Sequence, residues 1–138
     1  MGKVETTDVD VVRRALDAWN ARDIDAAETL AHPEIEWEVS GYLLADRGKV
    51  VRGREQFVQF GTLVFDTFAE SVLEVDELTV AGPGMVVGSG GALFRGVPDG
   101  AAVTARWVRL FQIRDGMIWR STIHATRESA LAAAGVER

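Results

Sequence analysis

The residue of this chain with the clearest capacity for chemistry is Arg109, which lies in an alternating stretch of apolar and aromatic residues. The alternation over 103–113 places Arg109 on the same face of a predicted strand as Trp107 and Phe111. An isolated buried charge is very costly, so a buried guanidinium requires a carboxylate partner or an anionic ligand. Arg109 is therefore a clamp for a carboxylate, enol or phosphate group, or a structural partner of a glutamate or aspartate. An outward-facing arginine on a bulged strand is the remaining alternative.

Other ionisable residues are candidates for acid/base chemistry. The imidazole of His124 titrates near neutral pH, as a general base requires, but its strand phase is opposite to that of Ser121 and Ile123, which favours a packed or interface histidine. Asp46 lies in a predicted loop, where an aspartate acts as an acid or base or simply forms a turn. His32 is interpreted as a helix-end residue without a functional role. The catalytic candidates are therefore Arg109, Asp46 and His124.

Aromatic residues are the main candidates for lining a pocket. As core residues they need no further explanation, and together they are consistent with a flat, apolar ligand. The predicted pocket-lining residues are Trp19, Trp37, Tyr42, Phe57, Phe60, Ser89, Trp107, Phe111, Trp119, Ser121 and Ile123. Trp119 either lines this cavity or marks a dimer surface.

Several classes of site and partner are not expected. The chain of 138 residues has no cysteine and two histidines, which argues against a zinc site or a thiol nucleophile. No helix follows the glycines of 82–91, so they are not a nucleotide fingerprint, and no GxSxG elbow is present. The net charge of −6 argues against nucleic-acid or anionic-membrane partners. We expect a single domain over 1–138, no metal or cofactor, no signal peptide or membrane span, and a cytoplasmic location.

Three helices are predicted before the main strands. Thr7 caps the first helix, and Asp23 caps a short second helix through about Ala31. The segment 35–39 alternates as a strand, and 40–53 is predicted to be a loop. A third helix begins at Arg54. Its apolar side includes Phe57, Phe60 and Val64. Gly61 within the helix suggests that another part of the chain packs closely against the helix backbone there.

The rest of the chain is mainly strand. Segments 70–80 and 85–95 are predicted strands, and a phase slip in the first indicates a bulge. Asp115-Gly116 joins the two alternating runs of a hairpin over 101–125, the strongest short-range signal in the chain. Thr126 begins a last helix that ends at Gly135. Helices followed by antiparallel strands predict an α+β fold.

The chain resembles the SnoaL-like branch of the nuclear-transport-factor-two-like superfamily, over nearly everything from Val9 to Gly135. The fragments that carry the resemblance are VVRRALDAWNARDIDAAETLAHPEIEWE, VRGREQF, LFQIRDGMIWR and TRESALAAAG. The resemblance implies a cone: a curved antiparallel sheet wrapped by the three N-terminal helices plus the C-terminal helix, around one central pocket. Its members include polyketide cyclases, ketosteroid isomerases and limonene-type epoxide hydrolases, so it transfers the fold better than the function.

The functional residues of these relatives are not found at the matching positions. The tyrosine, general base and protonated acid of the ketosteroid isomerases correspond to Ala15, Val39 and Arg109. The aspartate of the polyketide cyclase pair falls nearest Ser121 and Ile123. There is no Asp-Arg-Asp arrangement like that of the epoxide hydrolases. Relatives often have Tyr-x-Asp before the last helix; here the segment is His124-Ala125-Thr126, in which Thr126 is expected to cap.

Two functions of different classes remain open. The first is a small-molecule enzyme of isomerase, cyclase or lyase type, acting on a hydrophobic and possibly anionic molecule by acid/base chemistry. The second is a non-catalytic protein whose pocket binds a small hydrophobic molecule. A homodimer is also expected, because relatives commonly pair through the outer faces of their sheets. Apolar patches for that face are predicted at Thr104, Val108, Leu110 and Ile118.

Overall fold

Residues 7–39, 50–96 and 102–136 are described by the structure, a computed structural model. Their helices are α1 (Asp8–Asn20), α2 (Ile24–Thr29), α3 (Gly53–Thr67) and α4 (Arg127–Val136). Their strands are β1 (Ala31–Glu38), β2 (Val50–Arg52), β3 (Phe68–Leu73), β4 (Glu77–Gly82), β5 (Met85–Gly96), β6 (Ala102–Arg114) and β7 (Met117–Ile123). Two predicted site residues, Tyr42 and Asp46, lie outside the described residues.

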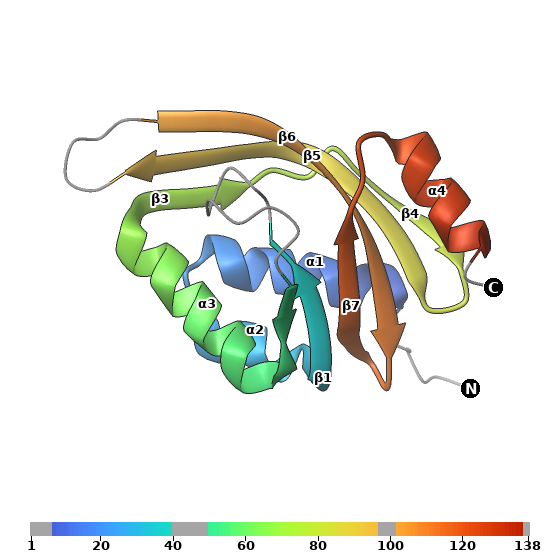
Figure 1. The fold of residues 1–138 in the computed structure, drawn as a ribbon, viewed down its shortest axis with the longest axis horizontal. Helices are drawn as coiled ribbons and strands as arrows, with labels where there is room; N and C mark the ends of the chain where they lie inside the picture. The colour runs from blue at the N-terminus through green and yellow to red at the C-terminus, as the bar shows by residue number, and fades with distance from the viewer. Residues whose placement is uncertain (1–6, 40–49, 97–101, 137–138) are drawn as a thin grey trace, which may run out of the picture.

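The strands form one strongly curled sheet in the order β2-β1-β7-β6-β5-β3, and β4 also pairs with β5. Helices α1, α2 and α3 lie against the concave face, and α4 lies on the convex face (Figure 1). The predicted α+β cone is therefore confirmed. One detail differs, because β1 and β7 run parallel while the other pairs are antiparallel. The sheet is mixed rather than purely antiparallel.

The predicted helix starts are confirmed by their caps. The hydroxyl of Thr7 accepts a hydrogen bond from the amide of Asp10, whose carboxylate accepts from the amide of Thr7. Asp23 accepts from the amide of Ala26 at the start of α2. Each bond satisfies an amide that the first helical turn leaves unpaired.

The boundary between α2 and β1 was predicted wrongly. The helix ends at Thr29, and β1 begins at Ala31, four residues before the predicted strand start. Pro33 is tolerated because β2 pairs with β1 only from Glu36 onward, which leaves the earlier part of β1 unpaired on that side. Part of the predicted loop 40–53 is also strand, since Val50–Arg52 forms β2.

The hairpin turn has the backbone that its sequence predicts. Asp115 and Gly116 have φ of 56° and 74°, the left-handed conformation that a two-residue hairpin turn needs. The register then shifts on β7, where Gln112 pairs with Arg120 but Ile113 pairs with Ile118. This bulge turns Ile118 onto the concave face, so its predicted place on the outer face is wrong.

Helix α4 covers part of the convex face. Its buried residues Ala130 and Ala134 pack against Met85, Val87 and Leu110. Thr126 caps the helix as predicted, because its hydroxyl accepts from the amide of Ser129. The apolar patch predicted at Leu110 is therefore buried within the chain.

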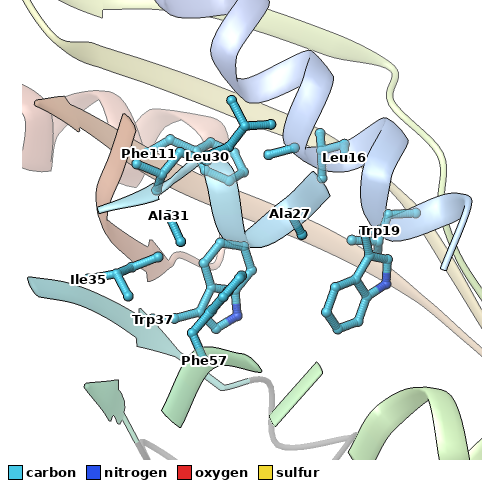
Figure 2. Close-up of a pocket in the computed structure, with 12 residues that line it drawn as sticks. Leu16, Trp19, Ala27, Leu30, Ala31, Ile35, Trp37, Phe57 and Phe111 are labelled. Atoms are coloured by element: carbon cyan, nitrogen blue, oxygen red, sulfur yellow. The ribbon is translucent and has the colours of Figure 1, made fainter. Parts of the chain in front are cut away.

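The core lies between the concave face and the first three helices. Trp19 of α1, Trp37 of β1, Phe57 of α3 and Phe111 of β6 converge there (Figure 2). The rings of Trp37 and Phe57 meet edge to face with centroids 5.6 Å apart. Gly61 lies under α2, where an added Cβ would come within 2.4 Å of the Ile24 side chain. The predicted close approach at Gly61 is thus to a side chain.

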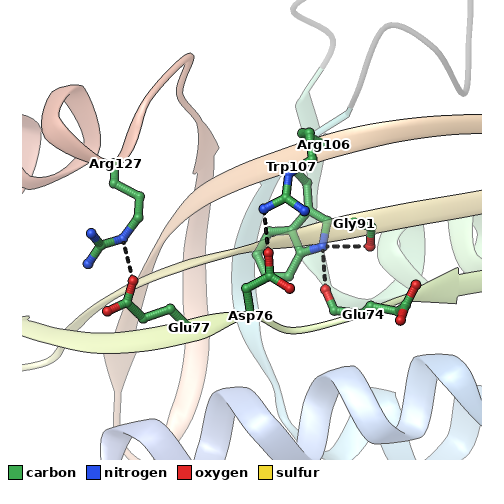
Figure 3. A network of polar contacts seen from close by, with 7 residues as sticks. All are labelled: Glu74, Asp76, Glu77, Gly91, Arg106, Trp107 and Arg127. Carbon is green, nitrogen blue, oxygen red and sulfur yellow. Dashed lines mark hydrogen bonds and ion pairs between the residues drawn. The ribbon is translucent and has the colours of Figure 1, made fainter.

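The sheet bends sharply between β3 and β4. Leu73 pairs with Ala92 and Glu77 pairs with Ser89, so three residues on one strand oppose two on the other, a bulge. The indole nitrogen of Trp107 donates to the carbonyls of Glu74 and Gly91, at 3.0 and 3.1 Å (Figure 3). The phase slip in the sequence predicted this bulge.

Gly90 is the residue that the bend requires. A Cβ at Gly90 would lie 1.8 Å from the carbonyl oxygen of Glu74, a contact no real side chain makes. At the neighbouring Gly91 the nearest heavy atom would be 3.8 Å away, an ordinary contact. The two adjacent glycines therefore provide a matched comparison.

We expect Gly90→Ala to lower the free energy of unfolding by about 1–3 kcal/mol, because the strand must move away from Glu74 to accept the methyl group. Gly91→Ala is the control and should cost much less. Urea denaturation followed by circular dichroism measures both. Equal stabilities for the two variants would show that the bend does not depend on this contact.

Candidate functional site

A small apolar cavity lies between the helices and the sheet (Figure 2). It is lined by Ala15, Leu16, Trp19, Ala27, Leu30, Ala31, Ile35, Trp37, Phe57, Leu73, Phe111 and Ile118. It leaves about 20 Å³ for the centres of water-sized molecules, which is room for about one water. A molecule larger than this enters only if the lining side chains move apart.

The periodicities of the elements bring these side chains together. Leu16 and Trp19 are three residues apart on one side of α1, and Ile35 and Trp37 alternate inward on β1. The indole nitrogen of Trp19 donates to the hydroxyl of Ser71 at 2.9 Å, which satisfies its polar group within the protein. The described lining is therefore apolar and contains no ionisable side chain.

Arg109 faces the concave side, as its phase with Trp107 and Phe111 predicts. Its guanidinium donates to the hydroxyl of Ser121 at 3.0 Å and to the main-chain carbonyl of Glu38 at 2.8 Å. Its Cζ lies 4.3 Å from the centroid of the Trp37 ring. Arg109 is buried but does not line the cavity described above. These bonds join β6, β7 and β1 through neutral oxygen atoms and so give Arg109 a structural role. Neither atom is the glutamate or aspartate carboxylate expected as its partner, and the ligand clamp stays a prediction.

His124, the second catalytic candidate, does not line the cavity. The imidazole of His124 lies 2.9 Å from the hydroxyl of Thr122, and its amide donates to the carbonyl of Val108. This pairing agrees with the packed histidine that its strand phase predicts. Asp46, the third catalytic candidate, lies outside the described residues.

His32 is a strand residue rather than a helix-end residue. Its Nδ1 accepts from the amide of Glu34, and its Nε2 lies 3.5 Å from a carboxylate oxygen of Asp115 in the hairpin turn. The nearly buried imidazole thus connects the start of β1 with the tip of the β6–β7 hairpin. His32 is not among the residues that line the cavity.

Eight of the eleven predicted pocket-lining residues separate into two groups by position. Trp19, Trp37, Phe57 and Phe111 line the cavity. Four others lie elsewhere on the concave side or at its edge: Phe60, Trp107, Ser121 and Ile123. Phe60 packs on Trp19 with ring centroids 6.1 Å apart, and Trp107 meets Phe111 edge to face. The amide of Ile123 is bound by the carboxylate of Glu38.

Two predicted lining residues lie away from the cavity. Ser89 pairs with Val108 and has the opposite phase to Gly90, so its side chain is on the convex face. Trp119 lies in the bulge of β7, between the guanidinium groups of Arg114 and Arg120 at 4.0 and 5.3 Å from its ring. Neither side chain lines the cavity, because a one-residue change of phase exchanges the two faces of a strand. The dimer surface expected as the alternative for Trp119 stays a prediction.

The sequence did not identify most of the small lining residues. Ala15, Ala27 and Ala31 border the cavity, but alanine in a helix or strand carries no signal for a pocket. Ile118 was missed because the bulge on β7 was not anticipated. The alternation of Ile35 with Trp37, the stripe of α1 and the predicted lining residues Phe57 and Phe111 pointed to this region. The resemblance also placed Ala15 at a functional position of the relatives.

The described residues contain no group of three or more histidine, aspartate or glutamate side chains that could hold a metal ion. Nor is any helix in the described part of the chain long and apolar enough to cross a membrane.

The family model of the SnoaL-like domain matches residues 12–121, most of the described cone. The chain belongs to the SnoaL-like domain family. This membership agrees with the curled sheet and its helices, and it covers the cavity as well as Arg109.

Solved structures of similar fold come from several sources. An NTF2-like protein of unknown function from Burkholderia pseudomallei is 20% identical, with a TM-score of 0.71 over 91% of this chain and 95% of that one. A candidate polyketide cyclase from Pseudomonas putida is 15% identical, with a TM-score of 0.71 over 93% and 98%. TerC, co-crystallised with polyporic acid, is 19% identical, with a TM-score of 0.70 over 93% and 98%. No curated protein matches the SnoaL-like chain significantly.

The hydrogen bonds of Arg109 predict that replacing this side chain lowers the stability of the fold. We expect Arg109→Leu to lower the free energy of unfolding by about 1–3 kcal/mol, since the buried Ser121 hydroxyl and the Glu38 carbonyl lose a charged donor. Thermal and urea unfolding without ligand measure the change.

The matched control is Arg106→Leu, on the same strand. Arg106 forms an exposed ion pair with Asp76, and such pairs are worth about 1 kcal/mol or less. If Arg109→Leu is as stable as the wild type, the structural account fails and the ligand-clamp alternative is restored.

Proposed function

We propose that this SnoaL-like protein binds a small apolar molecule between its helices and the concave face of its sheet. The observation that carries the proposal is the lining of the cavity, which is apolar and includes four aromatic rings. Apolar and aromatic surfaces dominate most small-molecule sites. The rings of Trp37 and Phe111, with centroids 6.2 Å apart and planes inclined at 53°, offer aromatic surface to such a molecule.

The buried end of the ligand should carry no charge. The indole nitrogen of Trp19 is already bound to Ser71, so it is not offered to a ligand. A charged or strongly polar group placed against this lining would lose its hydration without a replacement. The co-crystallisation of TerC with polyporic acid supports a small organic ligand for a protein of this fold.

A second candidate function is acid/base catalysis of isomerase, cyclase or lyase type. The observation that favours it is the similarity to a candidate polyketide cyclase. It requires an ionisable group next to the ligand, and the described lining supplies none. Asp46, outside the described residues, is the candidate left from the sequence. The absence of an ionisable group in the described lining makes binding the first proposal.

Native mass spectrometry of freshly purified protein is the experiment that tests the first proposal. We expect a co-purified apolar molecule, released under denaturing conditions. A preparation without any bound molecule, combined with no response to added flat apolar compounds, would count against it. Conversion of the released molecule by the protein would favour the second candidate.

Ala15 lines the cavity, so a larger side chain at this position should hinder ligand binding. We expect Ala15→Leu to reduce the rise in melting temperature caused by naphthalene, because the larger side chain fills the space that a ligand would use. A ligand at about ten times its Kd stabilises a protein by about 1.4 kcal/mol, so the wild-type shift should be measurable.

Ala132→Leu, at an exposed position of α4, is the control and should leave the naphthalene shift unchanged. The comparison uses the shift rather than the melting temperature itself, so overpacking by the new leucine does not affect it. An unchanged shift in Ala15→Leu would place the binding site elsewhere.

The homodimer expected from the sequence stays a prediction. Leu110 is covered by α4, and Ile118 lies on the concave face, so a dimer must use other parts of the surface. Light scattering distinguishes a particle of 15.0 kDa from one of twice that mass. The cytoplasmic location also stays a prediction.

A further inference from the structure

The parallel pairing of β1 with β7 ends where the side chain of Glu38 takes the place of a main-chain hydrogen-bond acceptor. The last pair of this ladder is Trp37 with Ser121. Beyond it, the amide of Ile123 donates to the carboxylate of Glu38 at 2.8 Å, in place of a main-chain carbonyl. The main-chain carbonyl of Glu38 instead accepts from Arg109. The carboxylate of Glu38 is therefore held between the two strands.

A polar groove opens over this point on the convex side of the sheet. It is lined by Glu36, Glu38, Val50, Arg52, Arg120, Ser121 and Thr122. It leaves about 380 Å³ for the centres of water-sized molecules, far more than the apolar cavity. Glu36 and Glu38 alternate with the concave residues Ile35 and Trp37, so their side chains face away from the cavity.

The charges in the groove are unequally compensated. The carboxylate of Glu36 forms ion pairs with both Arg52 and Arg120, at 3.2 and 3.5 Å. Among the residues that the structure describes, no cationic side chain forms an ion pair with the carboxylate of Glu38. The carboxylate accepts a hydrogen bond from the neutral main-chain amide of Ile123. Glu38 is also half-buried, so water compensates its charge less well than at the surface.

We propose that this groove binds a small organic amine, whose ammonium group pairs with the carboxylate of Glu38. A partly buried carboxylate gains more from a cation than an exposed one, because the local dielectric is lower. The half-buried side chain of Val50 borders the groove and offers contact to a short alkyl chain. An anion in the groove would be repelled by the carboxylate of Glu38. It would also have to compete with Glu36 for Arg52 and Arg120, because both arginines already form ion pairs with Glu36.

The hydroxyl groups of the lining residues are already oriented by the protein. The hydroxyl of Ser121 lies on the concave side and accepts from Arg109, and that of Thr122 lies 2.9 Å from His124. These contacts leave the carboxylate of Glu38 as the principal acceptor for an ammonium group. The site is on the opposite face of the sheet from the apolar cavity, so it does not rest on the function proposed above.

Titration of isotopically labelled protein with n-butylammonium chloride tests the site, with ¹H–¹⁵N spectra as the readout and ionic strength held constant. We expect saturable shifts of the amides around Glu38 and Thr122. Sodium butyrate, an anion with a chain of the same length, should not produce them. If butyrate binds there and butylammonium does not, the groove is an anion site and the proposal is overturned.

Glu38→Gln is the decisive variant, because the new amide oxygen can still accept from Ile123 while the charge is lost. It should weaken butylammonium binding by about tenfold or more, the effect of one lost charged hydrogen bond. Glu34→Gln removes an exposed carboxylate from the same strand and should leave binding unchanged. Equal weakening by both variants would indicate general attraction to a negative protein and would overturn the proposal, as would no saturable shift in the wild type.

Discussion

The contact between Gly90 and the main chain of Glu74 is the constraint on which the rest of this structure depends. The sheet bends at this point, and the bend leaves no room for a side chain at Gly90. The indole of Trp107 then holds the two bent strands together through main-chain carbonyls of each. A flatter sheet would not enclose the first three helices, and the apolar cavity would not form.

The curl gives the two faces of the sheet different chemistry. The concave face is covered by helices and collects the aromatic rings, while the convex face carries α4 and several ion pairs. The two environments come closest at the end of β1. There Arg109 stacks on Trp37 from the concave side and binds the main chain of Glu38, whose carboxylate belongs to the polar groove. The charge of Arg109 is tolerated inside the cone because its donors are bound.

Features set by neighbouring residues were predictable from the sequence. The caps at Thr7, Asp23 and Thr126 and the turn at Asp115-Gly116 follow from local chemistry, and all four are present. The phase of Ile118 was not predictable, because a one-residue bulge at Trp119 reverses the face and leaves no mark in the alternation. The parallel pairing of β1 with β7 and the alanine lining of the cavity depend on contacts between distant segments, which local patterns do not encode.

The position of α4 also has a practical consequence for spectroscopy. Ala130 and Ala134 seat this helix on the convex face, so its exposed residue Ala132 is separated from the cavity by the whole thickness of the sheet. A fluorophore or spin label attached there would report on the tumbling of the molecule without touching the helices that close the cone. The chain thus provides its own attachment point for measurements in which the cavity must stay unmodified.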